Sequence, residues 1–378
     1  MRKDCCGKTA VSTDVITVWP ERSIGKESYM LYQTRNPHGG DIYDGKIELD
    51  FSANTNPFGT PESVLDAARS ALARAHEYPD PYCRELVQAI AQFESVPKHS
   101  ILCGNGSAEL IYSFCRAVRP ASAVMPAPTF SEYAEGLAQT GCKIGRYALD
   151  PNNDFDLDEG FLDYLAEFRP EAVFLCNPNN PTGRVIGLSF LEEILDFCGA
   201  NGARLFVDEC FLDLTDDGVS MKDLLADNSH LFILKGFTKS YGMAGLRLGY
   251  CLSSDRKLLT AMSQNGQPWN VSTPAQAAGI AALRESGFLR RTKELIRSER
   301  ARLTESLEAL GFRALRSSAN YILFRGEPGL DAALLARGIA IRNCENYCGL
   351  GPGWYRIAVR LPEENGRLIA AMREICGE

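Results

Sequence analysis

The sequence contains no long hydrophobic run and no excess of positive charge. None of its 378 residues falls in a stretch approaching the roughly 18 apolar residues that cross a bilayer, so we expect no membrane-spanning helix and no membrane partner. Its 48 Asp and Glu residues outnumber its 40 Lys and Arg residues, giving a net charge of −8. This balance argues against nucleic acid or an anionic lipid surface as a partner. Internal repeats and low-complexity linkers are also lacking, which favours an ordinary globular enzyme.

Cysteine is present, but its pattern lacks the features of a disulfide framework or a metal site. The 13 cysteines are odd in number and scattered, and several lie within apolar stretches. Neither the pair Cys5-Cys6 nor the pair Cys344 and Cys348 has a second ligand pair at zinc-site spacing, so no metal is expected. No hydrophobic segment follows the first residues, so no signal peptide is visible. We therefore expect a reduced, cytoplasmic protein.

Apolar runs alternate with amphipathic stretches between residues 100 and 255. The predicted strands are Ala123–Met125, Lys143–Leu149, Ala172–Cys176, Arg204–Val207, Leu231–Leu234 and Leu246–Leu252. The stretch Phe190–Cys198, between two of them, is predicted to be helical. Strands that alternate with helices predict an α/β fold with a mostly parallel sheet covered on both faces. The active site of such a sheet lies at the carboxyl ends of its strands.

Another helix is predicted where Thr60 precedes Pro61, with Thr60 as its cap. The side chains expected to share its buried face are Val64, Leu65, Ala68 and Leu72. After residue 255 we predict a long charged helix over 287–310, strands at Tyr321–Phe324, Ile339–Arg342 and Tyr355–Val359, and a final helix.

These patterns divide the chain into four parts. Residues 1–37 have no clean periodicity and are predicted to form an irregular arm, whereas residues 38–60 are assigned to the substrate site and the small domain. Residues 61–265 are predicted to form a large cofactor-binding domain. Residues 266–378 are predicted to form a smaller α+β domain.

Two motifs could form loops around a ligand at strand ends. Residues Gly104–Glu109 read Gly-Asn-Gly-Ser-Ala-Glu and precede the helical run Leu110–Val118. Glycines at a helix start let backbone N–H groups approach an anion, although a plain glycine turn is the alternative. The segment Asn177–Gly183 contains two Asn-Pro units directly after a strand, with a rigid turn as the alternative.

Two further motifs carry candidate catalytic groups. Asp208-Glu209 ends a predicted strand, where an acid can also serve as a helix cap or face solvent. Lys239 stands between Thr238 and Ser240, after an apolar strand. A lysine in this setting is a candidate Schiff-base amine, and an exposed surface lysine is the alternative.

Taken in order, Asn-Pro-Thr-Gly, Asp-Glu, Thr-Lys and Gly-Leu-Arg-Leu-Gly-Tyr resemble the motifs of fold-type I pyridoxal 5′-phosphate (PLP) enzymes, the aminotransferase family. The resemblance spans about residues 38–378. It implies a large domain with a mostly parallel seven-stranded sheet between helices, a smaller α+β C-terminal domain, and PLP as cofactor. It further implies that Lys239 binds PLP covalently and that Asp208 pairs with the pyridinium nitrogen. A carboxylate there favours the protonated ring, which is the electron sink of PLP chemistry.

The resemblance also implies a set of cofactor contacts and a homodimer. The residues implied are Gly106, Ser107, Ala108, Thr238 and Arg247 at the PLP phosphate, Asn180 and Phe130 at its ring, and Tyr78 at the cofactor phosphate of the neighbouring subunit. One position departs from the family pattern. Three residues before the lysine a hydroxyl is usual, but this chain has Gly236, so the phosphate is expected to lose one contact.

Within the family, His38-Gly39-Gly40, the segment Asp50–Gly59 and the segments Ile341–Tyr347 and Tyr355–Arg360 resemble the threonine-phosphate decarboxylases of cobalamin biosynthesis. The resemblance implies a small phosphorylated amino acid as substrate. Its implied contacts are His38, Gly39, Asn54, Asn180, Arg342, which would bind the phosphate, and Arg356, which would bind the α-carboxylate. A strand-face ion pair is the alternative for either arginine, and a turn cap is the alternative for His38.

The resemblance implies that the chain decarboxylates O-phospho-L-threonine, and two other functions are alternatives to this reaction. The related histidinol-phosphate aminotransferases usually carry a tyrosine where this chain has Phe211, so an aminotransferase acting on histidinol phosphate or another amino acid is the nearest alternative. A PLP-binding regulator fused to a DNA-binding module is disfavoured, because the chain is acidic and its first residues lack a basic helix-turn-helix pattern.

Overall fold

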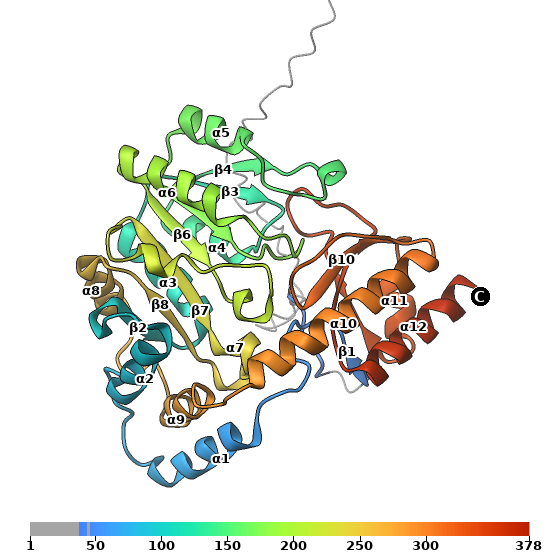
Figure 1. Ribbon diagram of the computed structural model, residues 1–378, viewed down its shortest axis with the longest axis horizontal. Coiled ribbons are helices and arrows are strands. Elements are labelled where there is room, and N and C mark those ends of the chain that lie inside the picture. The colour runs from blue at the N-terminus through green and yellow to red at the C-terminus, as the bar shows by residue number, and fades with distance from the viewer. Residues whose placement is uncertain (1–37, 44–45, 378) are drawn as a thin grey trace, which may run out of the picture. The chain divides into compact units, whose positions relative to one another are not determined.

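The computed structural model describes residues 38–43 and 46–377, and its centre is a seven-stranded sheet (Figure 1). Its strands, in chain order, are β2 (Ile101–Gly104), β3 (Ser122–Ala127), β4 (Lys143–Ala148), β5 (Ala172–Cys176), β6 (Arg204–Asp208), β7 (Leu231–Gly236) and β8 (Gly249–Leu252). They lie in the order β2-β8-β7-β6-β5-β3-β4. Only β8 runs antiparallel to its neighbours, whereas the other adjacent pairs are parallel. The predicted α/β class and mostly parallel sheet are confirmed.

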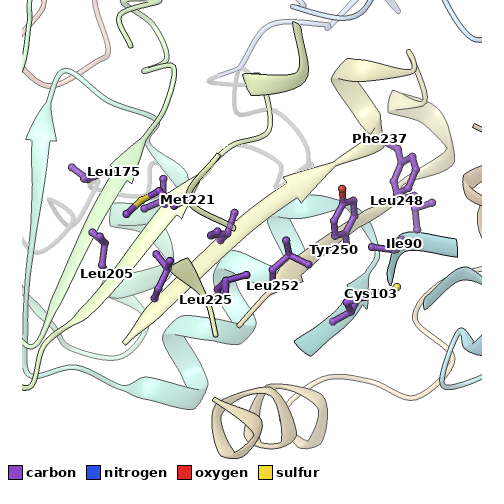
Figure 2. Close-up of a cluster of buried hydrophobic side chains, with 14 of the residues drawn as sticks. Ile90, Cys103, Leu175, Leu205, Met221, Leu225, Phe237, Leu248, Tyr250 and Leu252 are labelled. Atoms are coloured by element: carbon purple, nitrogen blue, oxygen red, sulfur yellow. The ribbon is translucent and has the colours of Figure 1, made fainter. Parts of the chain in front are cut away.

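Alternate residues of the central strands pack into two separate cores. In β5, Val173 and Leu175 belong to the core on one face, and Phe174 belongs to the core on the other. Alternate residues of β6 likewise belong to the two cores, because successive strand side chains point to opposite faces. Figure 2 shows the first of these cores, where Leu175 and Leu205 lie near Met221 and Leu225. Both faces of the sheet are therefore covered by apolar side chains.

Helices supply the rest of each core. The first face is covered by α1 (Glu62–Ala71), α2 (Arg84–Glu94), α5 (Gly160–Phe168), α6 (Leu188–Asn201) and α9 (Thr273–Ala282). The second is covered by α3 (Gly106–Val118), α4 (Glu132–Ala138) and α8 (Arg256–Gln264). This arrangement leaves the carboxyl ends of the parallel strands as the open edge of the sheet.

A second, smaller sheet is antiparallel. Its order is β12-β13-β10-β9, formed by β9 (Arg313–Ala314), β10 (Tyr321–Arg325), β12 (Arg342–Asn343) and β13 (Trp354–Ala358). The long helix α10 (Phe288–Ala309), together with α11 (Leu330–Leu335) and α12 (Pro362–Cys376), packs beside it (Figure 1). Strand β1 (Leu49–Asp50) pairs in parallel with β11 (Ile339–Ala340), which ties the N-terminal described segment to this part of the chain.

Several local predictions are corrected. Thr60 does not cap α1, because its hydroxyl donates to the Gly242 carbonyl at 2.8 Å and Pro61 takes the cap position without a side-chain hydrogen bond. Leu72 is 59% exposed and does not join the buried face. Strand β8 begins at Gly249 and not at Leu246, since Arg247 has a φ of 57°, which interrupts extended backbone.

Two other strand predictions also differ from the structure. The predicted strand Ile339–Arg342 is split into β11 and β12, which belong to different sheets. Strand β2 was not predicted, because it has four residues and its apolar run ends at once in the glycine motif.

The predicted domain boundaries stay predictions. Helix α9 packs against α1 and α2, and α10 then runs from beside the large sheet to the small one (Figure 1). The predicted arm over residues 1–37 lies outside the described residues. Among the helices of the described residues, none is both long and apolar enough to cross a membrane.

Candidate active site

Lys239 lies in α7 (Phe237–Ser240), the short helix that follows β7 at the carboxyl edge of the sheet. Its side chain is partly buried, and its Nζ lies 5.6 Å from the centre of the Phe211 ring. Burial, together with the guanidinium groups of Arg356 and Arg247, lowers the pKa of Lys239 to about 8. The backbone is held as well, because Asn56 N donates to the Lys239 carbonyl at 3.1 Å. A lysine with such a pKa is partly neutral near pH 7–8 and can act as a nucleophile.

Asp208 is the last residue of β6 and is buried. Its carboxyl accepts hydrogen bonds from the Tyr133 hydroxyl at 2.7 Å and from the Cys210 backbone N–H at 2.9 Å. Both donors are neutral, and burial raises the pKa of Asp208. A buried carboxylate is stabilised by a cation beside it. The Asp208 site therefore fits a protonated ring nitrogen, as the predicted role requires.

The predicted phosphate site lies at the start of α3. Gly106 has a φ of +76°, and a Cβ there would lie 2.4 Å from Nη2 of Arg247, so only glycine lets this guanidinium lie against the helix start. Ser107 and Ala108 form the first turn with it, and Thr238 is buried in α7. Free N–H groups at a helix start and an arginine together suit a phosphate group.

The structure gives a reason for the glycine at position 236. A Cβ on Gly236 would lie 2.3 Å from Oγ of Ser107. That hydroxyl donates to the Lys235 carbonyl at 3.1 Å and accepts from the Cys210 thiol at 3.2 Å. Ser107 thus occupies the space that a side chain at position 236 would need.

Arg356 and Asn180 come together from the two sheets. Arg356 is buried in β13, and it donates to Oδ1 of Asn180 and, at 2.9 Å, to the Ser52 carbonyl. All these acceptors are neutral, and its Nε makes no hydrogen bond to any described residue. The alternative of a strand-face ion pair is therefore wrong for Arg356 within the described residues. An anion would supply the missing counter-charge.

Arg342 lies directly opposite Arg356 in the β12–β13 register. Opposite residues of an antiparallel pair project from the same face, about 5 Å apart at Cβ, where like charges repel. Arg342 donates to the Asn343 carbonyl and, at 2.7 Å, to Oδ1 of Asn346. Two guanidinium groups are thus brought to one side of the small sheet.

The segment before β1 carries the remaining predicted substrate residues. Nε2 of His38 lies 2.8 Å from the Glu132 carboxyl, and its ring lies 6.0 Å from that of Phe130. A Cβ on Gly39 would lie 2.2 Å from the Ser52 carbonyl, so the chain can pass there only as glycine. Asn54 is buried, and its Oδ1 has no hydrogen-bond partner among the described residues.

Tyr78 is the one predicted residue whose described contacts lie apart from this cluster. It is 79% exposed, and its ring stacks on that of Trp269 at 4.5 Å. Its predicted place in a neighbouring subunit stays a prediction.

Three tyrosines in the site were not predicted from the sequence. Tyr133 donates to Asp208, Tyr321 donates to the Asn179 carbonyl at 2.9 Å, and Tyr347 lies beside Arg356. Tyr133 lies at the start of α4, three residues after Phe130, and its nearness in the sequence to a predicted site residue is a signal that could have found it. Tyr321 had no comparable signal, because it reaches the site from the small sheet, whereas Tyr347 ends the quoted segment Ile341–Tyr347 but was assigned no role.

Comparison with known proteins gives consistent matches along nearly the whole chain. The family model for class I and II aminotransferases matches residues 46–372. A threonine-phosphate decarboxylase of Salmonella typhimurium is 37% identical over 350 residues, which cover 89% of this chain and 96% of that protein. A histidinol-phosphate aminotransferase of Cupriavidus pinatubonensis is 34% identical over 335 residues, covering 86% and 87%.

Solved structures agree. The histidinol-phosphate aminotransferase of Sinorhizobium meliloti in complex with pyridoxal 5′-phosphate superposes with a TM-score of 0.80, at 25% identity over 94% of this chain and 99% of that one. The partly buried Lys239, the buried carboxyl of Asp208 and the glycine-lined helix start fit such a cofactor. The chain belongs to the class I and II aminotransferase family, has the fold of the type I PLP enzymes, and uses pyridoxal 5′-phosphate as its cofactor.

Proposed function

We propose that this enzyme decarboxylates O-phospho-L-threonine to (R)-1-aminopropan-2-ol O-phosphate, a step of cobalamin side-chain biosynthesis. The observation that carries the proposal is the opposed pair of Arg342 and Arg356. Two like charges in register are stabilised when a ligand places an anion on each. O-phospho-L-threonine has two anionic groups, a carboxylate for Arg356 and a phosphate for Arg342. The 37% identical threonine-phosphate decarboxylase supports this choice.

The site residues have separate roles in binding the cofactor, binding the substrate and transferring a proton. When bound, PLP supplies an electron sink for the electron pair left when a bond at the substrate Cα breaks. Asp208 keeps the ring nitrogen protonated, and Ser107, Thr238 and Arg247 hold the cofactor phosphate. Arg356 and Asn180 would bind the substrate carboxylate and fix its orientation. After carbon dioxide leaves, Lys239 Nζ delivers a proton to Cα.

The nearest alternative is a histidinol-phosphate aminotransferase, which the 34% identical relative favours. Phe211 argues against it. The Phe211 ring packs edge-on against Tyr321 at 5.0 Å and lies near Lys239, so this position offers no hydroxyl to the cofactor ring. Histidinol phosphate also lacks a carboxylate, so it would leave one arginine of the pair without an anion.

The test is to incubate the holoenzyme with O-phospho-L-threonine while following carbon dioxide and the amine product. We expect equal amounts of both without any keto acid, and no product from the Lys239→Ala variant. Glutamate formed from 2-oxoglutarate and histidinol phosphate at a comparable rate would overturn the decarboxylase assignment.

We also propose that the enzyme is a cytoplasmic homodimer in which Tyr78 reaches the partner subunit's cofactor phosphate. The exposed, stacked rings of Tyr78 and Trp269 support it, because large aromatic side chains in contact at a surface are typical of interfaces. The described cysteines are all free thiols and most are buried, which supports a reducing compartment.

Mixing two inactive variants tests the shared site. Lys239→Ala keeps Tyr78, and Tyr78→Ala keeps Lys239, so a mixed dimer contains one complete site. Random exchange of subunits should restore about a quarter of the wild-type sites. If Tyr78 serves its own subunit, the mixture stays as inactive as its components.

A further inference from the structure

Tyr347 is a buried tyrosine to which the sequence motifs assign no role. It follows β12 and is 6% exposed. Its hydroxyl lies 3.4 Å from Oδ1 of Asn180 and 3.4 Å from Nη1 of Arg356. Its ring lies 5.3 Å from the guanidinium carbon of Arg342. One side chain therefore touches three of the predicted substrate-binding residues, which come from three separate segments of the chain.

The loop that carries Tyr347 is fixed against both sheets. Tyr347 N donates to the Cys344 carbonyl at 3.0 Å, and Leu350 N donates to the Tyr347 carbonyl at 3.0 Å. A Cβ on Gly349 would lie 3.2 Å from the Ala127 carbonyl, so the loop packs on the end of β3 in the large sheet. The ring is therefore held in place independently of any ligand.

The ring of Tyr347 contacts Arg342, and its hydroxyl contacts Arg356 and Asn180. The face of a tyrosine ring attracts a guanidinium group placed over it, which favours one position of Arg342. The hydroxyl can accept from an N–H of Arg356 while it donates to Asn180. Burial raises the pKa of Tyr347, so the phenol stays protonated and keeps its donor at neutral pH.

We propose that Tyr347 is a positioning residue that determines specificity, because it sets the spacing between the two anion-binding arginines. Its ring positions Arg342 for the substrate phosphate, and its hydroxyl positions Arg356 for the carboxylate. This inference rests on the proposed function and deepens it. The enzyme selects substrates whose carboxylate and phosphate are separated as in O-phospho-L-threonine, and it rejects the one-carbon-longer O-phospho-L-homoserine.

Binding measurements on the holoenzyme separate the two roles. Three ligands are titrated while the visible absorbance of the cofactor is followed: O-phospho-L-threonine, L-threonine, which lacks the phosphate, and 1-aminopropan-2-ol O-phosphate, which lacks the carboxylate. Tyr347→Phe removes only the hydroxyl. It should weaken the two carboxylate ligands by about 2- to 10-fold, as expected for one hydrogen bond, and leave the third unchanged.

Tyr347→Leu removes the ring as well. Compared with Tyr347→Phe, it should weaken the two phosphate ligands by a further factor of about 3 to 30, the range of a cation–ring contact, and leave L-threonine unchanged. The preference for O-phospho-L-threonine over O-phospho-L-homoserine in kcat/KM should fall in parallel.

A matched control is Tyr355→Phe. Tyr355 is also a buried tyrosine of the small sheet, and its hydroxyl donates to the Glu327 carbonyl at 3.0 Å. This variant should leave all the dissociation constants as in the wild type. Equal weakening of the three ligands in both Tyr347 variants, or no weakening, overturns the proposal. A wild-type enzyme that binds O-phospho-L-threonine but releases no carbon dioxide overturns the proposed reaction instead, since for this ligand the absorbance change is read on rapid mixing, before product forms.

Discussion

Lys235 lies near the end of β7 and Lys239 lies in α7, the short helix that follows it, yet the charges around the two lysines are opposite in sign. Lys235 is 3% exposed, and its Nζ lies 2.9 Å from Glu94, 3.5 Å from Asp213 and 4.0 Å from Glu209. Burial lowers the pKa of Lys235, but these three carboxylates outweigh it and raise the pKa above its ordinary value. Around Lys239, burial and two arginines lower the pKa to about 8.

Neighbouring charges keep Lys235 permanently charged and leave Lys239 as a reactive amine, although both lie at the end of the same strand. Lys235 and Glu209 belong to a cluster in which each charge has an opposite charge nearby. Asp208, the neighbour of Glu209, belongs instead to a site where Lys239, Arg247 and Arg356 outnumber the carboxyl group. The first cluster is complete in the protein itself. The second is completed by the anionic groups of the cofactor and the substrate.

Replacing the reactive lysine should have the largest effect. Lys239→Ala removes both the covalent link to PLP and the proton donor, so we expect kcat/KM to fall on the order of 10⁴-fold. The variant should still unfold in one cooperative urea transition, because no ion pair is broken. Borohydride reduction and peptide mapping should label Lys239 in the wild type, and a label on another lysine would contradict the assignment.

Replacing the structural lysine should affect stability first. Lys235→Met leaves the buried carboxyls of Glu94 and Glu209, and the half-buried Asp213, without their shared cation. We expect this loss to cost about 3–5 kcal/mol of unfolding free energy. Lys222→Met is the matched control. Lys222 lies 3.1 Å from the same Glu94, but its side chain is 27% exposed, so we expect a cost of about 1 kcal/mol or less. Equal shifts in the two denaturation curves would contradict the idea of a complete buried cluster.

Arg342 tests whether the cationic site is completed by substrate. Arg342→Ala should lower kcat/KM for O-phospho-L-threonine by about 10²- to 10³-fold, because the phosphate loses its partner in a half-buried site. Arg342→Lys should recover part of this, since an ammonium cannot bind a phosphate with two parallel hydrogen bonds. L-Threonine serves as the comparison substrate. If the preference for the phosphorylated substrate survives in Arg342→Ala, the phosphate binds elsewhere.

The smallest expected effect is a pH dependence of the unfolding free energy of the cofactor-free protein. The pKa of Lys239 is about 8 in the folded chain against an ordinary value of 10.5, so between these pH values the unfolded chain binds more protons. Stability relative to Lys239→Met should therefore rise with pH across this window, by about 3 kcal/mol in total.

Between these same pH values, the contribution of Lys235 to stability should not change. Its raised pKa means that its stabilising contribution is fully present below the ordinary value and is lost only at still higher pH. Urea midpoints measured across the window check both lysines, and a stability difference for Lys239→Met that is flat or falls with pH would contradict the lowered pKa.

The sequence by itself determined the features that depend on local pattern. Apolar runs of the right length predicted the strand Ala172–Cys176, and the residues that follow such strands identified Asp208, Asn180 and Lys239 as candidates. The strand prediction is confirmed because a parallel strand buried on both faces must be apolar, and the candidate residues follow such strands because ligand sites lie at the carboxyl ends. The family motifs then indicated the cofactor.

Only the tertiary structure decided which distant residues meet. The contact between Asn180 and Arg356 spans 176 positions, and the bond from Tyr133 to Asp208 spans 75. The space that makes position 236 a glycine is filled by Ser107 from another element. The two lysines show the same limit. A sequence motif distinguishes Lys239 from Lys235, but it does not give their opposite pKa shifts. These arise from carboxylates and arginines that the fold brings to opposite sides of one strand end, because electrostatic interactions depend on distance and burial and not on order along the chain.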